Sequence, residues 1–458
     1  MKYQYDLLVI GSGSSGFSAA SAAKGRGRKI GIVEEESRWG GECPNWGCVP
    51  TKSLLKSARV YRDLKHAEVF GVKVKDVSFD FGAVMARRAK LVGALGGKRV
   101  EDTAEKLGID RIKGRATFLD EHTIHVGDKE YTSERFIIAT GAGTFVPPIP
   151  GIEKVDWIDF KTISRLEGLP ASMVIIGGGP VGCELATALS TFGTKVTLIQ
   201  SAPRVLNREE PEISQIAHDS LERLGVVVHV GAEVIQLSQE GDQKNATVRV
   251  GREMIKISSE FLLIATGKAS NTAGLGLKAA GVDLDERGTV ITNSEMRTSA
   301  KHIWAAGDVS GGMRFTHTAH HEGSVSGYNA FAGKDSVKAD ERVVPRVTFL
   351  DPEIASVGIT EEAAREGSGS VLVGSFQLKG LGRSFIDDEK YGIVKIVADE
   401  KTRKIIGGHI AGVRAGEMIH EIALAMYTNT SIDDLANMIH AYPTYSEGVL
   451  AAAGVAIS

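Results

Sequence analysis

Short apolar runs alternate with glycine-rich turns along this chain, and the first such pattern stands at its beginning. Residues 6–10 read DLLVI, residues 11–16 read GSGSSG, and small residues fill 18–23 before a second apolar run, IGIV, at 30–33. Short apolar runs bounded by turns predict buried strands, and a stretch of small residues predicts a closely packed helix. The pattern therefore predicts a strand, a turn, a helix and a second strand, in that order.

The same pattern returns at residues 171–200, which read ASMVIIGGGPVGCELATALSTFGTKVTLIQ. Each copy has the spacing G-x-G-x-x-G between its predicted strand and helix. The first glycine of such a motif makes the tight turn, the second lets the backbone approach a pyrophosphate, and the third lets helix and strand pack closely. The glycines concerned are Gly11, Gly13 and Gly16 in the first copy and Gly177, Gly179 and Gly182 in the second.

The residue that ends the second strand of each copy is a further candidate ligand. Glu34 and Gln200 stand at the same offset from the first glycine of their motif, and Glu34 is placed to accept hydrogen bonds from a ribose diol. One such motif alone is weak evidence, whereas two copies in register predict two dinucleotide sites. Two glycine-rich turns without ligands are the alternative.

Other candidate binding residues follow apolar strands. FIIATG ends in Thr140 and Gly141, FLLIATG ends in Gly267, and IWAAGD ends in Asp308. An aspartate at such a strand end can accept a hydrogen bond from a polyol hydroxyl, although alone it is more often a helix N-cap. Beside two dinucleotide motifs, we favour ligand binding for Asp308.

Composition and charge argue against several classes of partner. The chain has 458 residues and is expected to form about three domains. Its net charge is −3 with acids and bases interspersed, so the charge pattern predicts binding neither to nucleic acid nor to a membrane surface. No segment approaches the ~18 apolar residues of a transmembrane helix, and the chain begins directly with a strand pattern instead of a leader. We therefore predict a cytoplasmic protein.

Two of the three cysteines, Cys43 and Cys48, lie in the segment GGECPNWGCVPTK at residues 40–52. A metal clip, a structural staple and a redox pair are the alternatives. A tetrahedral zinc site needs three or four ligands, and the third cysteine, Cys183, is expected to be a small buried packing residue of the second glycine motif. Three cysteines in so long a chain are too few for the disulfide framework of a secreted protein. Two dinucleotide sites imply an electron relay, so a redox pair is favoured.

With these motifs the chain resembles the flavin-dependent pyridine nucleotide–disulfide oxidoreductases, specifically the branch of dihydrolipoamide dehydrogenase and mercuric reductase. The resemblance covers essentially the whole chain. It rests on both glycine motifs, GGECPNWGCVPTK, both ATG turns, AAGDV, VPRVTFLDPEIASVGIT and the closing HAYPTYSE. It implies an α/β fold with two Rossmann-like dinucleotide-binding domains and an α+β C-terminal dimerisation domain. The implied order is an FAD-binding domain at 1–147, an NAD(P)-binding domain at 148–272, a central domain completing the FAD site at 273–340, and the dimerisation domain at 341–458.

The resemblance also implies roles for individual residues. FAD and NAD(P)H are the implied cofactors, with Cys48 facing the flavin as the charge-transfer thiol and Cys43 exchanging with substrate. Lys52 is implied to lie near the flavin and to pair with Glu184. A homodimer is implied as well, in which HAYPTYSE of one chain covers the disulfide of the other.

The closing motif departs from the pattern of the thiol-exchanging relatives. Aligned on Pro443 and Glu447, Tyr442 occupies the position of their histidine base, with Glu447 at the position of its carboxylate partner. A tyrosine titrates near ~10 and a histidine near ~6.5, so Tyr442 is a poor base at neutral pH, although it can donate a hydrogen bond. His440 could replace the base only if the loop bends, and a structural role is favoured for it. The resemblance implies a cis peptide before Pro443.

The nicotinamide cofactor is predicted with a slight lean to NADPH. NADH-specific relatives hold the 2′-hydroxyl with an acid where this chain has the neutral Gln200. Arg204 and Arg208 follow, and they could tolerate a 2′-phosphate, although both could equally be surface arginines.

The predicted function is an FAD-dependent NAD(P)H oxidoreductase that passes electrons through Cys43 and Cys48 to a small acceptor such as a metal ion, a quinone or a disulfide. Dihydrolipoamide dehydrogenase and mercuric reductase proper are alternatives. The FTHTAHHEG segment at 315–323 also resembles mercuric reductases, but the sequence shows no cysteine-bearing carrier domain and no terminal cysteine pair. A flavoprotein kept for scaffolding, with a vestigial site, is the least favoured alternative.

Overall fold

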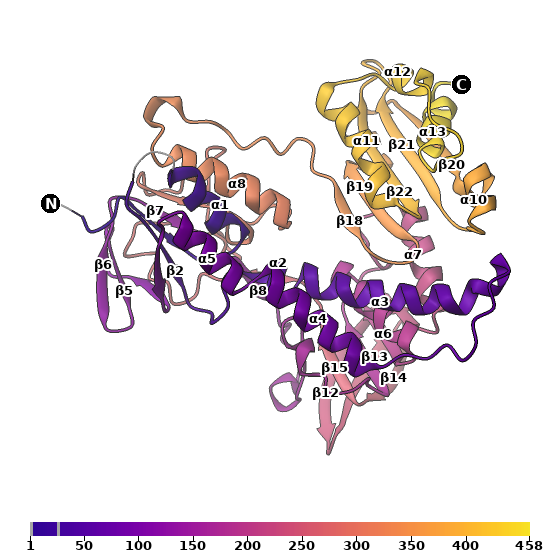
Figure 1. Ribbon diagram of the computed structural model, residues 1–458, viewed down its shortest axis with the longest axis horizontal. Helices are drawn as coiled ribbons and strands as arrows, with labels where there is room; N and C mark the ends of the chain where they lie inside the picture. Colours follow the sequence, from indigo (N-terminus) through magenta and orange to yellow (C-terminus); the bar gives the residue numbers. More distant parts are fainter. Residues whose placement is uncertain (1–2, 25–27) are drawn as a thin grey trace. The chain divides into compact units, whose positions relative to one another are not determined.

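A computed structural model describes residues 3–24 and 28–458, and it divides them into two compact units. The first unit comprises the described residues of 1–53, 85–145 and 267–341. The second comprises residues 54–84, 146–266 and 342–458. Each unit is drawn in Figure 1 and is described separately below.

The first unit is built on a parallel five-stranded sheet in the order β17-β7-β1-β2-β3 (Figure 1). Its central strands are buried on both faces, which explains their near-continuous runs of leucine, isoleucine and valine. Leu7 pairs with Ile30 in the parallel register, so the first predicted strand–turn–helix–strand pattern is confirmed. The strands are β1 (Leu7–Ile10), β2 (Ile30–Glu34), β3 (Asp110–Lys113), β7 (Phe136–Ile138) and β17 (Ile303–Ala305).

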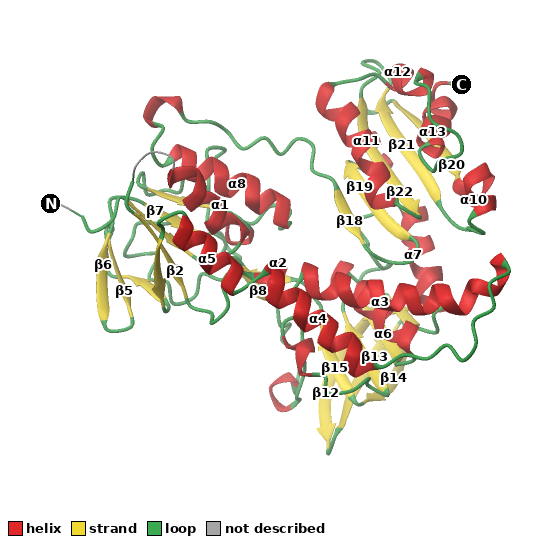
Figure 2. Ribbon diagram, in the orientation of Figure 1, coloured by secondary structure: helices red, strands yellow, loops and turns green. Residues whose placement is uncertain are grey.

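Two helices rich in small residues pack against each other in this unit. They are α1 (Ser14–Lys24) and α8 (Thr316–Asn329), which lie side by side in Figure 2. An added Cβ at Gly323 or at Gly327 would lie 2.1 Å from a backbone oxygen of α1, so only glycine permits this approach. The contact joins the first glycine motif to a segment about 300 residues later in the chain.

Smaller sheets complete the first unit. One is an antiparallel sheet of β4 (Ala116–Phe118), β5 (Thr123–Val126) and β6 (Lys129–Thr132). Another pairs β8 (Ala142–Thr144) with β16 (Lys268–Ser270), which brings together the segments after the two ATG tripeptides. The helices α4 (Phe81–Leu95), whose first residues belong to the second unit, and α5 (Lys98–Lys106) precede β3.

The second unit repeats the nucleotide-binding topology. Its parallel sheet has the order β11-β10-β9-β15, and the helix α6 (Pro180–Phe192) begins within the second glycine motif, directly after Gly179. The strands are β9 (Ser172–Ile176), β10 (Lys195–Gln200), β11 (Val227–Val230) and β15 (Phe261–Ile264). The helix α7 (Pro211–Arg223) and an antiparallel meander of β12 (Ala232–Glu240), β13 (Gln243–Val250) and β14 (Glu253–Ser259) lie between β10 and β15 in sequence.

The C-terminal part of this unit is an antiparallel sheet covered by helices (Figure 2). Its strands follow the order β18-β19-β22-β21-β20, with α11 (Ala415–Thr428) packed on β19 and β22 and α13 (Glu447–Ile457) packed on β20 and β21. The remaining elements are β18 (Arg346–Thr348), β19 (Glu353–Gly358), β20 (Val371–Gln377), β21 (Ile393–Asp399), β22 (Ile405–Gly412), α10 (Gly382–Ile386) and α12 (Ile432–Asn437). The predicted fold class, two Rossmann-like domains and an α+β C-terminal domain, is confirmed.

A buried ion cluster connects α7 to the C-terminal sheet inside the second unit. The Lys395 ammonium group on β21 lies 2.9 Å from a Glu210 carboxylate oxygen, 2.6 Å from Glu212 and 2.8 Å from Glu361. Its side chain is only 5% exposed. A buried charge needs compensating partners, and this lysine has three.

No helix in the part of the chain that the structure describes combines the length and the apolar character needed to cross a membrane. The predicted boundaries at 147, 272 and 340 stay predictions.

Candidate active site

The first glycine motif forms a tight backbone cradle. Gly11 has a φ of 108°, and an added Cβ there would lie 2.3 Å from the Ala139 carbonyl oxygen. An added Cβ at Gly16 would lie 1.9 Å from the Gly11 oxygen, so this glycine permits the helix to approach the strand. The Glu34 carboxylate is held at the end of β2 because it accepts hydrogen bonds from the Ser12 N–H at 2.8 Å and the Ser12 hydroxyl at 2.6 Å. The predicted ligand residue therefore lies beside the predicted phosphate-binding turn.

The second motif has the same construction. An added Cβ at Gly177 would lie 2.3 Å from the Ala265 oxygen, and one at Gly182 would lie 1.9 Å from the Gly177 oxygen. At Gly179, by contrast, an added Cβ meets no described atom within 4 Å, so the middle glycine faces open space. The Gln200 side chain accepts a hydrogen bond from the Gly178 N–H at 2.9 Å. It thus occupies the place that Glu34 has in the first motif.

The two cysteines lie in one short turn of the first unit. Cys43 is in α2 (Glu42–Asn45), and Cys48 begins α3 (Cys48–His66). Both are reduced, and a hydrogen bond with Cys48, together with burial, raises the pKa of the Cys43 thiol. The Thr316 hydroxyl, at the start of α8, lies 3.5 Å from the Cys48 sulfur. The Cys43 thiol thus holds its proton more tightly than a free thiol does.

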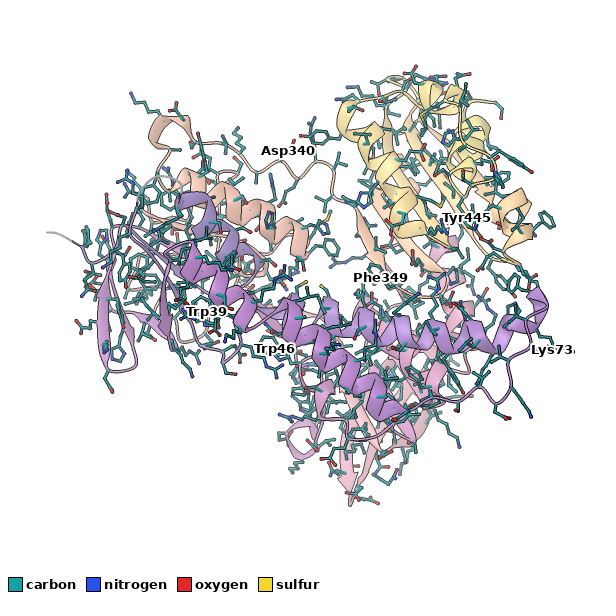
Figure 3. The ribbon with its side chains drawn as sticks, in the orientation of Figure 1. Trp39, Trp46, Lys73, Asp340, Phe349 and Tyr445 are labelled. Atoms are coloured by element: carbon teal, nitrogen blue, oxygen red, sulfur yellow. The ribbon has the colours of Figure 1, made fainter. Side chains whose placement is uncertain are left out.

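The cysteine turn lies against the first glycine motif. An added Cβ at Gly41 would lie 2.6 Å from the Gly13 Cα atom. Trp39, just before this segment, and Trp46, between the two cysteines, are labelled in Figure 3. The structure therefore brings the glycine motif and the cysteine pair together, as the resemblance predicts.

A charge network joins the cysteine turn to Asp308. The Lys268 ammonium group donates to the Glu42 carboxylate at 2.5 Å and to the Asp308 carboxylate at 3.1 Å. Burial raises the pKa of the Glu42 carboxyl although Lys268 opposes this effect. Burial alone would lower the pKa of Lys268, but Glu42 and Asp308 raise it. Our sequence analysis missed Glu42 and Lys268, although one lies inside the cysteine motif and the other directly follows the second ATG.

A second acid supports the Asp308 turn and was also missed. The Glu322 carboxylate on α8 accepts a hydrogen bond from the Gly307 N–H at 2.5 Å and from the Ser310 hydroxyl at 3.3 Å. Burial and a hydrogen bond with Glu341 raise the pKa of Glu322 to about 8. No periodicity in the sequence marks this residue, because its role depends on the contact between α8 and a distant strand end.

The remaining predicted residues have definite positions within their own units. The Thr140 hydroxyl donates to the Asn271 carbonyl oxygen at 2.8 Å, and Gly141 and Gly267 both have positive φ. Glu184 is buried on α6 and accepts a hydrogen bond from the Phe349 N–H at 3.0 Å, so it is not a surface acid. Lys52 belongs to the first unit and Glu184 to the second, and their pairing stays a prediction.

Cys183 is fully buried, and burial raises the pKa of its thiol, so the predicted packing role is confirmed. Arg204 is half-buried, and its Nε has no hydrogen-bond partner among the described residues.

The closing motif places tyrosine, not histidine, on the surface. Tyr442 is 78% exposed, and the Tyr442–Pro443 peptide is cis, as predicted. The His440 side chain is only 4% exposed, and its Nε2 lies 2.6 Å from a Glu421 carboxylate oxygen. The structural role predicted for His440 fits this geometry. Glu447 accepts a hydrogen bond from the Thr444 N–H at 2.9 Å, and the neighbouring Tyr445, labelled in Figure 3, is buried.

The described residues fit two dinucleotides. At both motifs a glycine-rich turn leads into a helix, whose free N–H groups and dipole favour a pyrophosphate. Glu34 and Asp308 are carboxylates of the kind that bind ribose and polyol hydroxyls. Among the described residues, no three histidine, cysteine, aspartate or glutamate side chains gather in a way that could hold a metal ion.

Comparison with known proteins agrees with this geometry. The family described as pyridine nucleotide-disulphide oxidoreductase matches residues 5–323. Its dimerisation domain matches residues 344–453. The two matches together span nearly the whole chain.

Individual relatives are similar over nearly the whole of this chain. The chain is 36% identical to the mercuric reductase of Lysinibacillus sphaericus, a match that covers 98% of this chain and 82% of that protein. It is 38% identical to the dihydrolipoyl dehydrogenase of Chlorobaculum parvum, covering 99% and 97% of the two chains. Among solved structures, the Cu(II) complex of the HOCl-induced flavoprotein disulfide reductase RclA from Escherichia coli matches with a TM-score of 0.88 and 30% identity, covering 99% of both chains.

Proposed function

This chain belongs to the pyridine nucleotide-disulphide oxidoreductase family, and we propose that Cys43 and Cys48 are the redox-active pair through which it passes electrons. The family and its relatives make it an FAD-dependent disulfide oxidoreductase that uses NAD(P)H. The observation that carries the proposal is the hydrogen-bonded pair of thiols in one turn against the first glycine motif. The chemistry that bound FAD supplies is transfer of an electron pair from nicotinamide to a disulfide.

The residues of the chain divide the work between binding and proton handling. Glu34 and Asp308 would hold the sugar and polyol hydroxyls of FAD, and Gly179 leaves room for the nicotinamide dinucleotide. By its place in the family motif Cys48 would face the flavin, while Cys43, whose thiol pKa is raised, would exchange with the acceptor. Thr316 contributes a hydroxyl that can stabilise a thiolate.

We propose a thiophilic metal ion of the Cu(II) type as the acceptor. Two neighbouring thiols are soft ligands that suit Cu(I), the product of Cu(II) reduction, and the structurally similar RclA is described as a Cu(II) complex. Tyr442 supports the same choice, because reduction of a metal ion involves no dithiol substrate whose proton a histidine would accept, and the protons of the enzyme thiols can pass to water. In the balanced step, two Cu(II) ions take one electron each, both thiols lose their protons, and a Cys43–Cys48 disulfide forms.

The test uses NADPH and NADH with Cu(II) as acceptor, comparing the wild type, Cys43→Ser and Cys183→Ala. Cys43→Ser should retain reduction of the flavin by the nicotinamide but lose turnover of Cu(II) to the level without enzyme. Cys183→Ala removes the third thiol and should keep turnover. Full Cu(II) turnover in Cys43→Ser would refute the role of the pair.

After Cu(II), dihydrolipoamide is the second candidate for the physiological substrate, because dihydrolipoyl dehydrogenases are among the similar proteins. The exposed Tyr442 at the base position argues against it. Lipoamide turnover above that of Cu(II) in the wild type would reverse this order.

For the nicotinamide cofactor we infer a preference for NADPH. Gln200 carries no charge that would repel a 2′-phosphate, and its side-chain amide lies 3.4 Å from the Arg204 carbonyl oxygen, so Arg204 is next to the end of β10. The Arg204 Nε is buried without a partner among the described residues, which a phosphate oxygen would satisfy.

Arg204→Gln should lower kcat/KM for NADPH by about 10- to 100-fold, the range expected for a lost charged hydrogen bond. The value for NADH should change little. Arg252→Gln alters an exposed arginine in the turn before β14 and serves as the control. An equal loss with both cofactors would contradict the inference.

We also propose a homodimer. The family's dimerisation domain matches residues 344–453. In this region several large apolar side chains are strongly exposed within the single chain, which is typical of a surface that a partner covers. They include Leu424, Tyr427, Ile439 and Tyr442.

A further inference from the structure

The cysteine turn carries an acid that the proposed electron relay does not use. Glu42 immediately precedes Cys43, and its side chain is largely buried. Its carboxylate accepts a hydrogen bond from Lys268 at 2.5 Å, and the same ammonium group reaches Asp308 at 3.1 Å. Two acids and one base thus share a poorly solvated site between the cysteine turn and a predicted FAD ligand.

The Glu42 carboxylate also lies against the residue before Cys48. Its Oε1 atom, which binds Lys268, would be 3.2 Å from a Cβ added at Gly47. The Glu42 backbone carbonyl accepts hydrogen bonds from the Trp46 N–H at 2.8 Å and the Gly47 N–H at 2.7 Å. These contacts fold the turn so that the charged end of Glu42 stays near Cys48.

Lys268 is held in place from its backbone side. The Arg314 guanidinium donates to the Lys268 carbonyl oxygen at 2.5 Å and to the Ser270 hydroxyl at 3.1 Å. Strand β16 therefore fixes the backbone of Lys268, and Glu42 and Asp308 fix its ammonium group.

Electrostatic coupling between Glu42 and Cys48 has a definite sign. A thiolate at Cys48 contributes to the raised pKa of the Glu42 carboxyl, after burial and Asp308. Coupling between two titrating groups is reciprocal, so the Glu42 carboxylate must in turn disfavour a thiolate at Cys48. Lys268 opposes that effect by neutralising the carboxylate. Lys52, which lowers the pKa of Cys43, and Asp308 are the other charges facing this pair.

We propose that Glu42 and Lys268 are positioning residues that set how readily the Cys48 thiol ionises, and that Lys268 also orients the Asp308 carboxylate. The inference rests on the proposed role of Cys48 as the thiol facing the flavin. Glu42 and Lys268 are called the tuning pair below, because they would adjust the ionisation of Cys48 where the cysteines meet the flavin.

The test titrates the long-wavelength thiolate-to-flavin absorption band of the two-electron-reduced holoenzyme against pH. Glu42→Gln should move the midpoint down by about one pH unit, because a like charge next to the thiolate is removed. Lys268→Met should move it up by a similar amount. The double variant should return close to the wild-type midpoint, and Glu42→Asp should stay near it because the charge is kept.

Controls separate this inference from other causes. Glu35→Gln removes an exposed acid of the same unit and should leave the midpoint unchanged. Flavin content per chain, measured from absorbance, identifies any variant that has merely lost FAD. Absence of the band in the wild type would refute the proposed role of Cys48. A band that is present, but whose midpoint moves the same way in both single variants or in neither, would refute the tuning pair alone.

Discussion

At the scale of single residues, the closing motif separates two candidates that the sequence places two positions apart. His440 is buried against Glu421, whereas Tyr442 is exposed, and the Thr444 N–H holds Glu447 in place. The exposed residue at the base position is therefore a phenol and not an imidazole. The preference for an acceptor that requires no general base follows from this one side chain.

Tyr442→His should raise the turnover of dihydrolipoamide at pH 8 by about 100-fold, the lower part of the range for general-base catalysis. A histidine titrates near ~6.5 and is neutral at that pH, so it can accept the thiol proton. Steady-state rates of the wild type, Tyr442→His and Tyr442→Phe provide the measurement. Tyr442→Phe lacks both hydroxyl and base and should gain nothing. An equal gain in both variants would show that base function is not what the substitution restores.

The sequence predicts functional residues that stand at a fixed spacing within a motif. It does not predict contacts between side chains that are distant in the chain. The glycines, Glu34, the cysteine pair and Asp308 all belong to continuous motifs, and within the first unit the structure brings those of the FAD site together. Glu42 and Lys268 are 226 positions apart. Their contact depends on how β16 and the cysteine turn meet, which no local pattern encodes.

At the scale of elements, the two glycine turns differ in what each glycine permits. Gly182 is required by protein packing, because its Cβ would lie 1.9 Å from a backbone oxygen. Gly179 has an ordinary φ of −80° and open space around it among the described atoms. Gly182 is therefore required for the fold, and Gly179 leaves room for a ligand.

Gly179→Ala should leave the melting temperature unchanged while raising KM for NADPH by about 10-fold or more, since a methyl group fills the path of the dinucleotide backbone. Gly182→Ala should instead lower the melting temperature, because helix and strand must separate. Thermal unfolding and steady-state kinetics on both variants test the contrast. Equal effects of the two substitutions on stability would contradict it.

The ion cluster around Lys395 is an element-scale feature that the sequence did not predict. The four charges come from α7, α9 (Glu361–Ser368) and β21, and only the tertiary fold brings them together. Apolar runs predicted the strands, because burial on both faces demands them. No comparable periodicity marks a lone lysine whose partners lie on two distant helices.

Lys395→Met should lower the free energy of unfolding of the second unit by about 3–5 kcal/mol, because Glu210 is left buried without its cation. Urea denaturation gives the measurement, with the exposed Lys401→Met as the control. A smaller loss of unfolding free energy in Lys395→Met than in Lys401→Met would disprove the stabilising role of the cluster.

The cluster also predicts acid sensitivity. The hydrogen bond from Lys395 lowers the pKa of Glu361, so this carboxylate stabilises the fold above its unfolded pKa of ~4.3 and ceases to do so as pH falls through the lowered value. The wild type should therefore lose stability between about pH 5 and pH 3 more steeply than Lys395→Met. Parallel pH profiles of the two proteins would contradict this reasoning.

At the scale of the whole molecule, the exposed apolar side chains of the C-terminal part indicate a surface that a partner covers. Ile439 is 97% exposed, an unusual position for a large aliphatic residue that precedes the closing motif. A second copy of the chain, joined through the matched dimerisation domain, would bury it.

Ile439→Lys should weaken the dimer by about 10-fold or more, because a charge would enter the centre of an apolar interface. Sedimentation velocity over a range of concentrations gives the measurement. Met254→Lys, which changes an exposed apolar residue of the β13–β14 hairpin, is the matched control. A wild type that stays monomeric and active would contradict the dimer itself.

The division of the chain into two interleaved units has a consequence for biosynthesis. Helix α8 supplies Thr316 and Glu322 to the first unit, yet the ribosome makes it only after the whole segment 146–266 of the second unit. That continuous segment can fold as it emerges, whereas the N-terminal glycine turn must wait, incomplete, for a helix made some 300 residues later. The nascent chain would therefore bind flavin only late in its synthesis. A chain released from a ribosome stalled before residue 316 would be unable to retain flavin.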